Sequence, residues 1–165
     1  MRFYGLTLVA SAVVLGACSG STDKGAATTD TAKAPSPTPA TTPATGAVAK
    51  APATGKTWEI KMIGDGTTYK YEPANLTIKS GDNVKWTMVS GGPHNVSFDP
   101  DSIPAAAKAQ LSANMDAQMS EDAGPLLSNA NESYEISFAR IPAGTYKFYC
   151  TPHRAMNMMG TITVK

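Results

Sequence analysis

The residues with the most distinctive chemistry lie near the end of the sequence, in the run Tyr149-Cys150-Thr151-Pro152-His153-Arg154-Ala155-Met156-Asn157-Met158-Met159-Gly160. The chain has two histidines, and the other one, His94, follows a Gly-Gly-Pro turn. A thiolate, two imidazoles and a thioether form a soft, mixed nitrogen and sulfur ligand set, which suits copper in a trigonal site with a weak, long axial methionine. These residues predict a copper site formed by His94, Cys150, His153 and one of the methionines.

Three other interpretations of the same residues remain open at this point. The Cys-x-x-His step is half of a zinc site, although no second pair of Cys or His supplies a fourth strong ligand for structural zinc. A cysteine and a histidine can form a nucleophile and its base, but no oxyanion motif can be read nearby. The methionines can be plain core residues, because Met fills irregular gaps.

Period-two alternation of β-branched and aromatic residues predicts the strands that must position this site. It occurs at residues 58–62, 76–79, 84–88, 134–138, 146–149 and 161–164. Turn sequences separate these runs and no crossover helices lie between them, so we predict an all-β fold, an antiparallel β-sandwich. Residues 104–119 are rich in helix formers with a proline near the start, which predicts one short helix across an edge.

The chain resembles the cupredoxin family of copper proteins, and among its members the plastocyanins most closely. The ligand segment matches in residue type and spacing, as Phe148-Tyr149-Cys150-x-Pro152-His153-x4-Met158-x-Gly160. The resemblance continues upstream through Pro93-His94-Asn95-Val96-x-Phe98-Asp99, Met119-Ser120-Glu121-Asp122 and Pro142-Ala143-Gly144-Thr145-Tyr146. It covers essentially residues 69–165, and its two ligand segments at matching positions make it specific.

The resemblance implies a Greek-key sandwich that holds one type 1 copper ion. One loop would supply His94, and another loop would supply Cys150, His153 and Met158. Asn95 would join the two loops by hydrogen bonds and would direct a backbone N–H at the cysteine sulfur.

The resemblance also implies where electrons enter and leave. They would pass at the edge of His153, which would reach the surface through an apolar rim, with Arg154 as the neighbouring charge. Tyr149, beside the cysteine, would offer a second exit. Four acidic residues match the places where plant plastocyanins carry acidic patches: Asp99, Asp101, Glu121 and Asp122.

The ligand loop departs from the plastocyanin pattern in a way that bears on the axial ligand. The sequence Ala155-Met156-Asn157 stands where plastocyanins usually have Gly-Ala-Gly, and the loop is nearer to that of pseudoazurins. Met156 would fit the shorter loop of amicyanins. The Met-x-Gly step leading into the last strand selects Met158, with Met159 expected to point into the sandwich.

The N-terminal region predicts export and a lipid anchor. Residues 1–17 read as a signal peptide, whose apolar run is too short to span a bilayer as a mature helix. Its end, Leu15-Gly16-Ala17-Cys18, resembles the lipobox of bacterial lipoproteins, so we expect Cys18 to be lipidated. Cys150 is then an odd thiol that a disulfide cannot explain. The alternatives are a plain secretory signal cleaved near Ala17, or a buried strand.

A tether and one domain follow, at residues 18–56 and 57–165. From Ser19 to Lys56, 31 of 38 residues are Ala, Gly, Ser, Thr or Pro, and Val48 is the only large aliphatic residue. Such a segment cannot bury enough surface to offset its ordering entropy, so we expect a disordered tether.

Charge and ligand chemistry narrow the function. A net charge of +1 without a Lys/Arg cluster argues against a nucleic-acid partner. A ligand set that serves Cu(I) and Cu(II) and leaves no open position for substrate favours a one-electron carrier over an enzyme.

We expect a monomer in the periplasm or on the outer cell surface. It would dock transiently on redox proteins, such as cytochromes or an acceptor of the reaction-centre or oxidase type. The alternatives are an exported copper carrier or storage lipoprotein and a metal-free structural sandwich.

Overall fold

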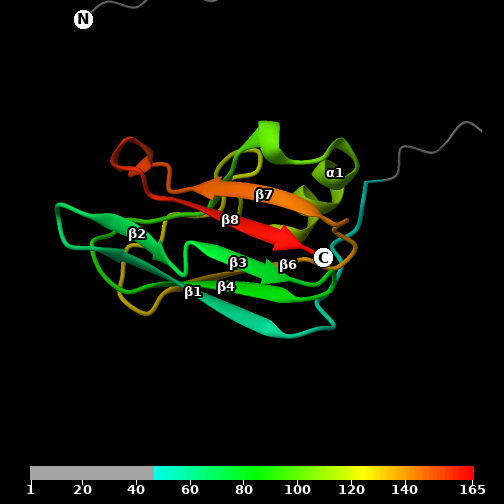
Figure 1. Cartoon of the computed structure of the whole chain (residues 1–165), viewed down its shortest axis with the longest axis horizontal. Coiled ribbons are helices and arrows are strands. Elements are labelled where there is room, and N and C mark those ends of the chain that lie inside the picture. The colour runs from blue at the N-terminus through cyan, green and yellow to red at the C-terminus, as the bar shows by residue number, and fades with distance from the viewer. Residues whose placement is uncertain (1–46) are drawn as a thin grey trace, which may run out of the picture. The chain divides into compact units, whose positions relative to one another are not determined.

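Two four-stranded sheets pack face to face in the computed structural model (Figure 1), which describes residues 47–165. The predicted signal, Cys18 and the tether up to residue 46 lie outside the described residues. One sheet has the order β2-β1-β4-β6 and the other β3-β8-β7-β5. The strands are β1 (Thr57–Gly64), β2 (Tyr69–Glu72), β3 (Asn75–Ile78), β4 (Asn83–Met88), β5 (Ser97–Phe98), β6 (Ser133–Ser137), β7 (Gly144–Tyr149) and β8 (Met159–Val164).

Alternating side chains form the core between the sheets. The inward positions of β4 are Val84, Trp86 and Met88, and those of β7 include Tyr146 and Phe148, all exposed by 5% or less. Successive side chains of a strand point to opposite faces, so an apolar residue at every second position buries one face. The predicted β-sandwich is confirmed, and the six strands expected from alternation are present.

Two strand pairings are parallel, although an antiparallel sandwich was expected. β1 pairs with β4 from Thr57↔Asn83 to Met62↔Met88, and β3 pairs with β8 in the same parallel sense. The other pairings among the described strands are antiparallel. Alternation indicates which face of a strand is buried but not the direction of its neighbour. After β2, the chain crosses to the second sheet to form β3 and then returns to the first sheet as β4. Strand β4 therefore runs in the same direction as its neighbour β1.

The shortest elements were the hardest to predict. Alternation does not predict β2, which has four residues and is followed by Pro73, or β5, which has two. The expected short helix is confirmed as α1 (Ala105–Asn114), which begins after Pro104 and buries Leu111 in the core. Two 3-10 helices, η1 (Pro100–Ser102) and η2 (Arg154–Met156), lie in loops. None of the described helices has the length and apolar character needed to cross a membrane.

Residues 49–56, which composition assigned to the tether, pack against the domain. We call this segment the N-terminal strap. The Gln110 side-chain amide donates to the Ala49 carbonyl at 3.1 Å, and the Ala51 N–H donates to Asn114 Oδ1 at 2.9 Å. Ala51 is only 2% exposed. The contacts of the folded domain therefore begin at Ala49, ahead of the boundary expected from composition.

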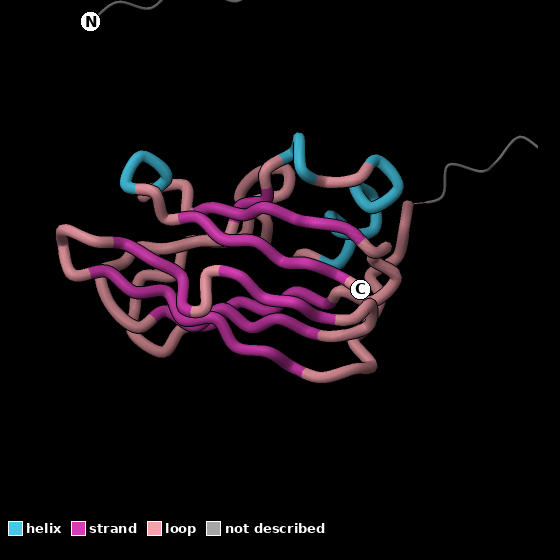
Figure 2. Tube along the Cα trace, viewed as in Figure 1, coloured by secondary structure: helices cyan, strands magenta, loops and turns pink. Residues whose placement is uncertain are grey.

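The strap and the predicted ligand loops lie at opposite ends of the sandwich (Figures 1 and 2). In Figure 1 the loop between β7 and β8 stands at the left, while the strap and the C terminus lie at the right. Figure 2 shows η2 in the left-hand loop and α1 toward the other end. We call the first end the metal pole (residues 89–94 and 150–158) and the second the strap pole (residues 49–56, 79–82, 139–143 and 165).

Candidate metal centre

Three of the sequence-predicted ligands converge at the metal pole. The donor atoms of His94, Cys150 and His153 all lie within 4.8 Å of one another. The two histidine Nδ1 atoms are 3.2 Å apart, and the Cys150 Sγ lies 3.7 Å from Nδ1 of His94 and 3.4 Å from Nδ1 of His153. His94 and Cys150 are fully buried, and His153 is 7% exposed. Residues 59 positions apart in the chain thus share one site.

The spacing of these three atoms fits a metal ion. A circle through three points separated by 3.2, 3.4 and 3.7 Å has a radius of about 2.0 Å, close to metal–nitrogen and metal–thiolate bond lengths of about 2.0–2.3 Å. Two imidazoles and one thiolate suit copper. A structural zinc site needs a fourth strong donor, and within residues 47–165 no further His, Cys, Asp or Glu joins the group.

His94 is fixed in orientation and tautomer by its loop. Its Nε2–H donates to the Ser90 carbonyl at 2.9 Å, so a neutral ring keeps its proton there and presents Nδ1 to the other donors. The His94 N–H donates to the Leu127 carbonyl, and the Leu127 N–H donates back to the His94 carbonyl. Gly91 has φ +74°, and a Cβ there would collide with the backbone of Gly64. The Gly-Gly-Pro turn thus lets the loop approach β1 closely.

The second ligand loop turns back to bring Met158 beside the cysteine. The Cys150 N–H donates to the Met158 carbonyl at 3.1 Å, and the Met158 N–H donates to the His153 carbonyl at 3.2 Å. Asn157 ends η2 with φ 63°, a left-handed conformation that asparagine tolerates better than most residues and that reverses the chain. Met158 is completely buried, whereas Met156 is 53% exposed.

The start of β8 corrects one expectation about the methionines. Met159 is 46% exposed, so the expectation that it points into the sandwich is wrong. The inward position belongs to Gly160, because a Cβ there would collide with the Phe148 ring and the Ala74 carbonyl. This packing accounts for the Met-x-Gly step after the loop.

Asn95 joins the two ligand loops, as the resemblance implied. Its Oδ1 accepts from the Thr151 N–H at 2.8 Å, and its Nδ2 donates to Thr151 Oγ1 at 3.2 Å and to Ser97 Oγ at 3.1 Å. The Tyr71 hydroxyl donates to the Asn95 carbonyl at 2.6 Å. A buried network whose members all have partners specifies one arrangement. The relative position of the two loops is therefore fixed by the protein itself.

Burial sets the protonation of the three donors. It lowers the pKa of His94, against the opposite effect of the bond to Ser90, and it lowers the pKa of His153, with His94 acting in the same direction. Both rings are therefore neutral near pH 7, which is the form that binds metal. Burial also raises the pKa of the Cys150 thiol, although the Asn95 and His153 backbone N–H groups lower it. Metal binding must therefore displace the thiol proton.

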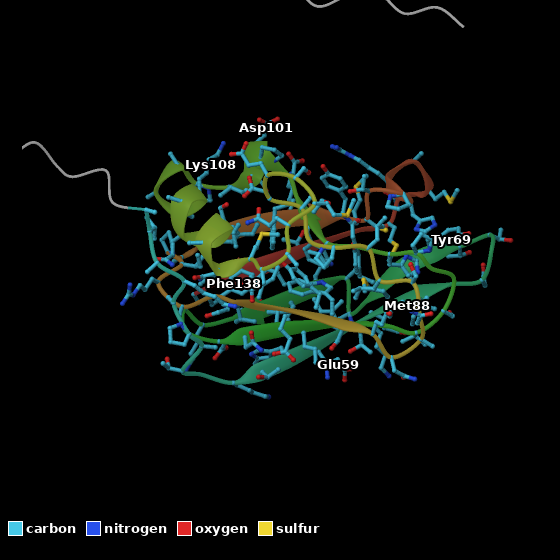
Figure 3. The ribbon with its side chains drawn as sticks, turned by 180° about the vertical axis from the view of Figure 1, so that it is seen from behind. Glu59, Tyr69, Met88, Asp101, Lys108 and Phe138 are labelled. Carbon is cyan, nitrogen blue, oxygen red and sulfur yellow. The ribbon has the colours of Figure 1, made fainter. Side chains whose placement is uncertain are left out.

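Tyr69 completes the site, and sequence reasoning did not single it out. Its ring stacks on that of His153, with centroids 3.8 Å apart and planes at 11°, and it meets the His94 ring edge-on at 6.1 Å. Figure 3 shows Tyr69 at the metal pole, at the start of β2. The sole sequence signal was an aromatic residue directly after the Gly64-Asp65-Gly66-Thr67-Thr68 turn.

The expected second electron exit at Tyr149 and the expected acidic patch differ from the surface that the structure shows. The Arg154 guanidinium lies over the Tyr149 ring, 4.1 Å from its centroid, so it covers the second electron exit that was expected. Of the four acidic residues, Asp101 and Glu121 are exposed, but Asp122 is buried and burial raises its pKa. Asp99 lines a hollow of about 270 Å³ together with Lys147 and Arg154. The four do not form a continuous exposed acidic patch.

Comparisons with known proteins agree with this chemistry. A family model described as copper binding proteins, plastocyanin/azurin family, matches residues 58–165. Plastocyanin from Nostoc punctiforme is 40% identical over 120 residues, which cover 72% of this chain and 81% of that protein. Plastocyanin from Scenedesmus fuscus is 37% identical over 106 residues, covering 64% of this chain and 97% of that protein.

A solved structure matches the same region. Oxidised plastocyanin from Dryopteris crassirhizoma is 36% identical, with a TM-score of 0.50, and the match covers 66% of this chain and 100% of that one. The matched region of this chain therefore spans the full length of that solved protein.

Proposed function

Because the chain belongs to the plastocyanin/azurin family of copper-binding proteins, we propose that it is a blue copper electron carrier that shuttles single electrons between redox proteins. The observation that carries the proposal is the convergence of two histidine Nδ1 atoms and one cysteine Sγ, 3.2 to 3.7 Å apart, in a buried pocket. Copper supplies one-electron chemistry, Cu(I)/Cu(II), when it is bound there. The domain is proposed to act without transforming a substrate.

Each residue of the pocket has a proposed role. His94, Cys150 and His153 are the strong ligands, and Met158 is the axial one, because it is buried beside Cys150 whereas Met156 is exposed. Asn95 holds the two loops in register. With every donor inside, the pocket excludes water and keeps the ligands close to one arrangement.

The visible spectrum of the oxidised domain tests this proposal. A cysteine thiolate bonded to Cu(II) gives intense charge-transfer absorption, so the copper-loaded protein should be deep blue with one copper per chain. Cys150→Ser should lose the colour, and His94→Ala should severely perturb it. A colourless wild-type protein loaded with Cu(II) would refute the proposal.

A copper carrier or storage protein is the rival function, and the exposed thioethers of Met156 and Met159 are the observation that favours it. The two functions differ in how fast Cu(I) leaves. An electron carrier should keep Cu(I) when a competing chelator is added, because its donors are buried, whereas a delivery protein should release it quickly.

We also propose that the protein is exported and held at a bacterial membrane by lipid on Cys18, with the domain in the periplasm or on the outer surface. The support is the Leu15-Gly16-Ala17-Cys18 sequence and the tether that follows it. Intact mass of the membrane-extracted protein tests the anchor: a chain beginning at diacylated Cys18 is expected, and a free Cys18 or a soluble product would refute it.

The proposed partners are redox proteins that dock briefly, such as cytochromes or an acceptor of the oxidase or reaction-centre type. A carrier must bind and separate quickly, which calls for a small interface of under about 1,200 Å². The proposed surface is the part of the metal pole around His153.

A further inference from the structure

Exposed cations surround a hollow at the strap pole, at the far end of the domain from the metal site. The hollow measures about 410 Å³ and is lined by Lys56, Trp58, Thr77, Ile78, Lys79, Asp82 and Lys165. A second hollow of about 350 Å³ beside it includes Arg140 and the strap residues Ala51, Pro52 and Thr54. Lys56, Lys79 and Arg140 are all exposed, and none of them has an ion pair among the described residues.

The one acidic side chain that lines this hollow, Asp82, is turned inward. Asp82 is 7% exposed and accepts from the Trp58 Nε1–H at 2.9 Å, from the Lys56 N–H at 2.9 Å and from the Lys79 N–H at 3.0 Å. Its charge is thus used to order the backbone from which two of the lysines project. The side chains of Lys56, Lys79 and Arg140, in contrast, present positive charge to solvent.

An aromatic ring lies among these cations. Trp58 is half-buried, and the Lys56 ammonium lies 3.8 Å from its ring centroid. An amphipathic aromatic ring with lysines and arginine around it is the composition that settles at the headgroup level of an anionic bilayer. A protein partner would also meet cations here, but the position of the chain favours a membrane.

The chain leading toward Cys18 leaves the domain at this same pole. The strap runs along it, held by the bonds of Thr54 and Gly55 N–H groups to the Gly81 carbonyl. Because the chain enters the domain at this pole, the strap pole is the end of the domain nearest to the preceding segment, while the metal pole lies at the opposite end of the sandwich (Figure 1).

We propose that the strap pole, centred on Lys56, Trp58, Lys79 and Arg140, docks on the anionic phospholipid surface of the membrane. This proposal rests on the proposed attachment of the protein to a membrane, and it does not depend on copper binding. It gives the tethered carrier a preferred orientation, with the metal pole facing away from the bilayer toward soluble or protruding redox partners.

Vesicle binding by the unlipidated domain, residues 47–165, tests the proposal without the anchor. The domain should sediment with vesicles containing phosphatidylglycerol and stay in solution with phosphatidylcholine alone. Each Lys or Arg at an anionic surface contributes about a factor of 5 to binding, so Lys79→Glu combined with Arg140→Glu should weaken binding by about 30-fold or more. The matched control is Lys61→Glu with Lys147→Glu, which changes net charge equally at exposed sites on β1 and β7 and should have a much smaller effect.

Trp58 fluorescence locates the contact. Lipids brominated near the headgroup should quench Trp58, whereas Trp86 is fully buried in the core and should not respond, so Trp58→Phe should abolish the quenching. Equal weakening by the pole and control variants, or no quenching, would overturn the proposal.

The same samples separate this proposal from the copper function. The copper site lies at the other pole, so the blue absorption should survive the pole substitutions; absent colour in the wild type would count against copper and leave the vesicle result standing. If the pole substitutions slow electron transfer to a soluble acceptor while vesicle binding is unchanged, the pole serves an acidic protein partner and the membrane proposal is wrong.

Discussion

Two methionines in the ligand loop, Met156 and Met158, differ in exposure by about half of their surface. The Met-x-Gly step selected Met158 over Met156 as the expected axial ligand, and the burial of Met158 beside Cys150 supports that proposal. The nature of the axial ligand tunes the reduction potential of such a site.

Met158→Gln should therefore keep the copper but lower the reduction potential, because a harder oxygen donor favours Cu(II). Met156→Gln, at an exposed position, is the matched control and should leave the potential nearly unchanged. Redox titration followed in the visible spectrum measures both. If only Met156→Gln lowers the potential, the axial assignment is reversed.

The ring of Tyr69 packs against a ligand, so its removal should loosen His153. An aromatic pair of this kind contributes about 0.5–1.5 kcal/mol beyond its buried area. Tyr69→Leu should accordingly lower the free energy of unfolding and speed the release of Cu(I) to a chelator. Tyr69→Phe keeps the ring and should keep both values near wild type. Rapid release from Tyr69→Phe as well would assign the effect to the hydroxyl rather than to stacking.

At the scale of the elements, the features that could be predicted are those with a signal in the local sequence. The Cys-x-x-His step and the second histidine predicted three residues whose donor atoms converge in the structure, and alternation predicted the long strands. Features that depend on contacts between segments far apart in the chain could not be predicted. The parallel register of β1 with β4 is set by where the chain crosses between sheets, and the stacking of Tyr69 on His153 joins residues far apart in the chain.

The strap shows the same limit. Its composition is that of a disordered segment, but its order comes from its backbone groups, which bond to the side chains of Gln110 and Asn114. Composition measures how much apolar surface a segment can bury and cannot show a hydrogen bond from elsewhere.

The turn before β4 is held by the Asp82 carboxylate. The stability of the domain should therefore depend on pH. Bonds from the Lys79 N–H first, then from Trp58 and the Lys56 N–H, hold the pKa of Asp82 below its ordinary value of 3.8. This stabilisation is present above pH 3.8 and is lost as the pH falls through the lowered pKa of the folded state.

Asp82→Asn should therefore destabilise the domain by about 1–2 kcal/mol near pH 7, because hydrogen bonds to a charged group are replaced by weaker ones. The gap between the two proteins should close as the pH falls below 4, where the wild-type carboxyl gains its proton. Urea unfolding at a series of pH values measures it. A gap that stays constant with pH would show that the charge of Asp82 contributes nothing.

For the whole molecule, the proposed functions assign electron transfer to the metal pole and membrane contact to the strap pole. The metal pole holds the donors beneath its surface. The positively charged Arg154 directly follows the predicted ligand His153 in the sequence. A charge at the rim of an interface acts on the rate of association more than on the site beneath it.

Arg154→Glu should leave the blue spectrum nearly unchanged and alter the second-order rate with a redox partner severalfold at low ionic strength. Screening should remove the difference in strong salt, where the Debye length falls to about 3 Å. Stopped-flow measurements of both proteins at low and high salt give these rates. Equal rates at low salt would mean that partners do not approach by this face.

The hydrogen bond from His94 Nε2 to the Ser90 carbonyl and the link from Asn95 to Thr151 have a consequence for speed. Electron transfer is slowed by the nuclear rearrangement that accompanies a change of oxidation state. Here the protein's own hydrogen bonds hold the donor-bearing loops in place. A copper ion held by these donors would then change its bond lengths and angles little between the two oxidation states, so the reorganisation energy of the proposed carrier should be small.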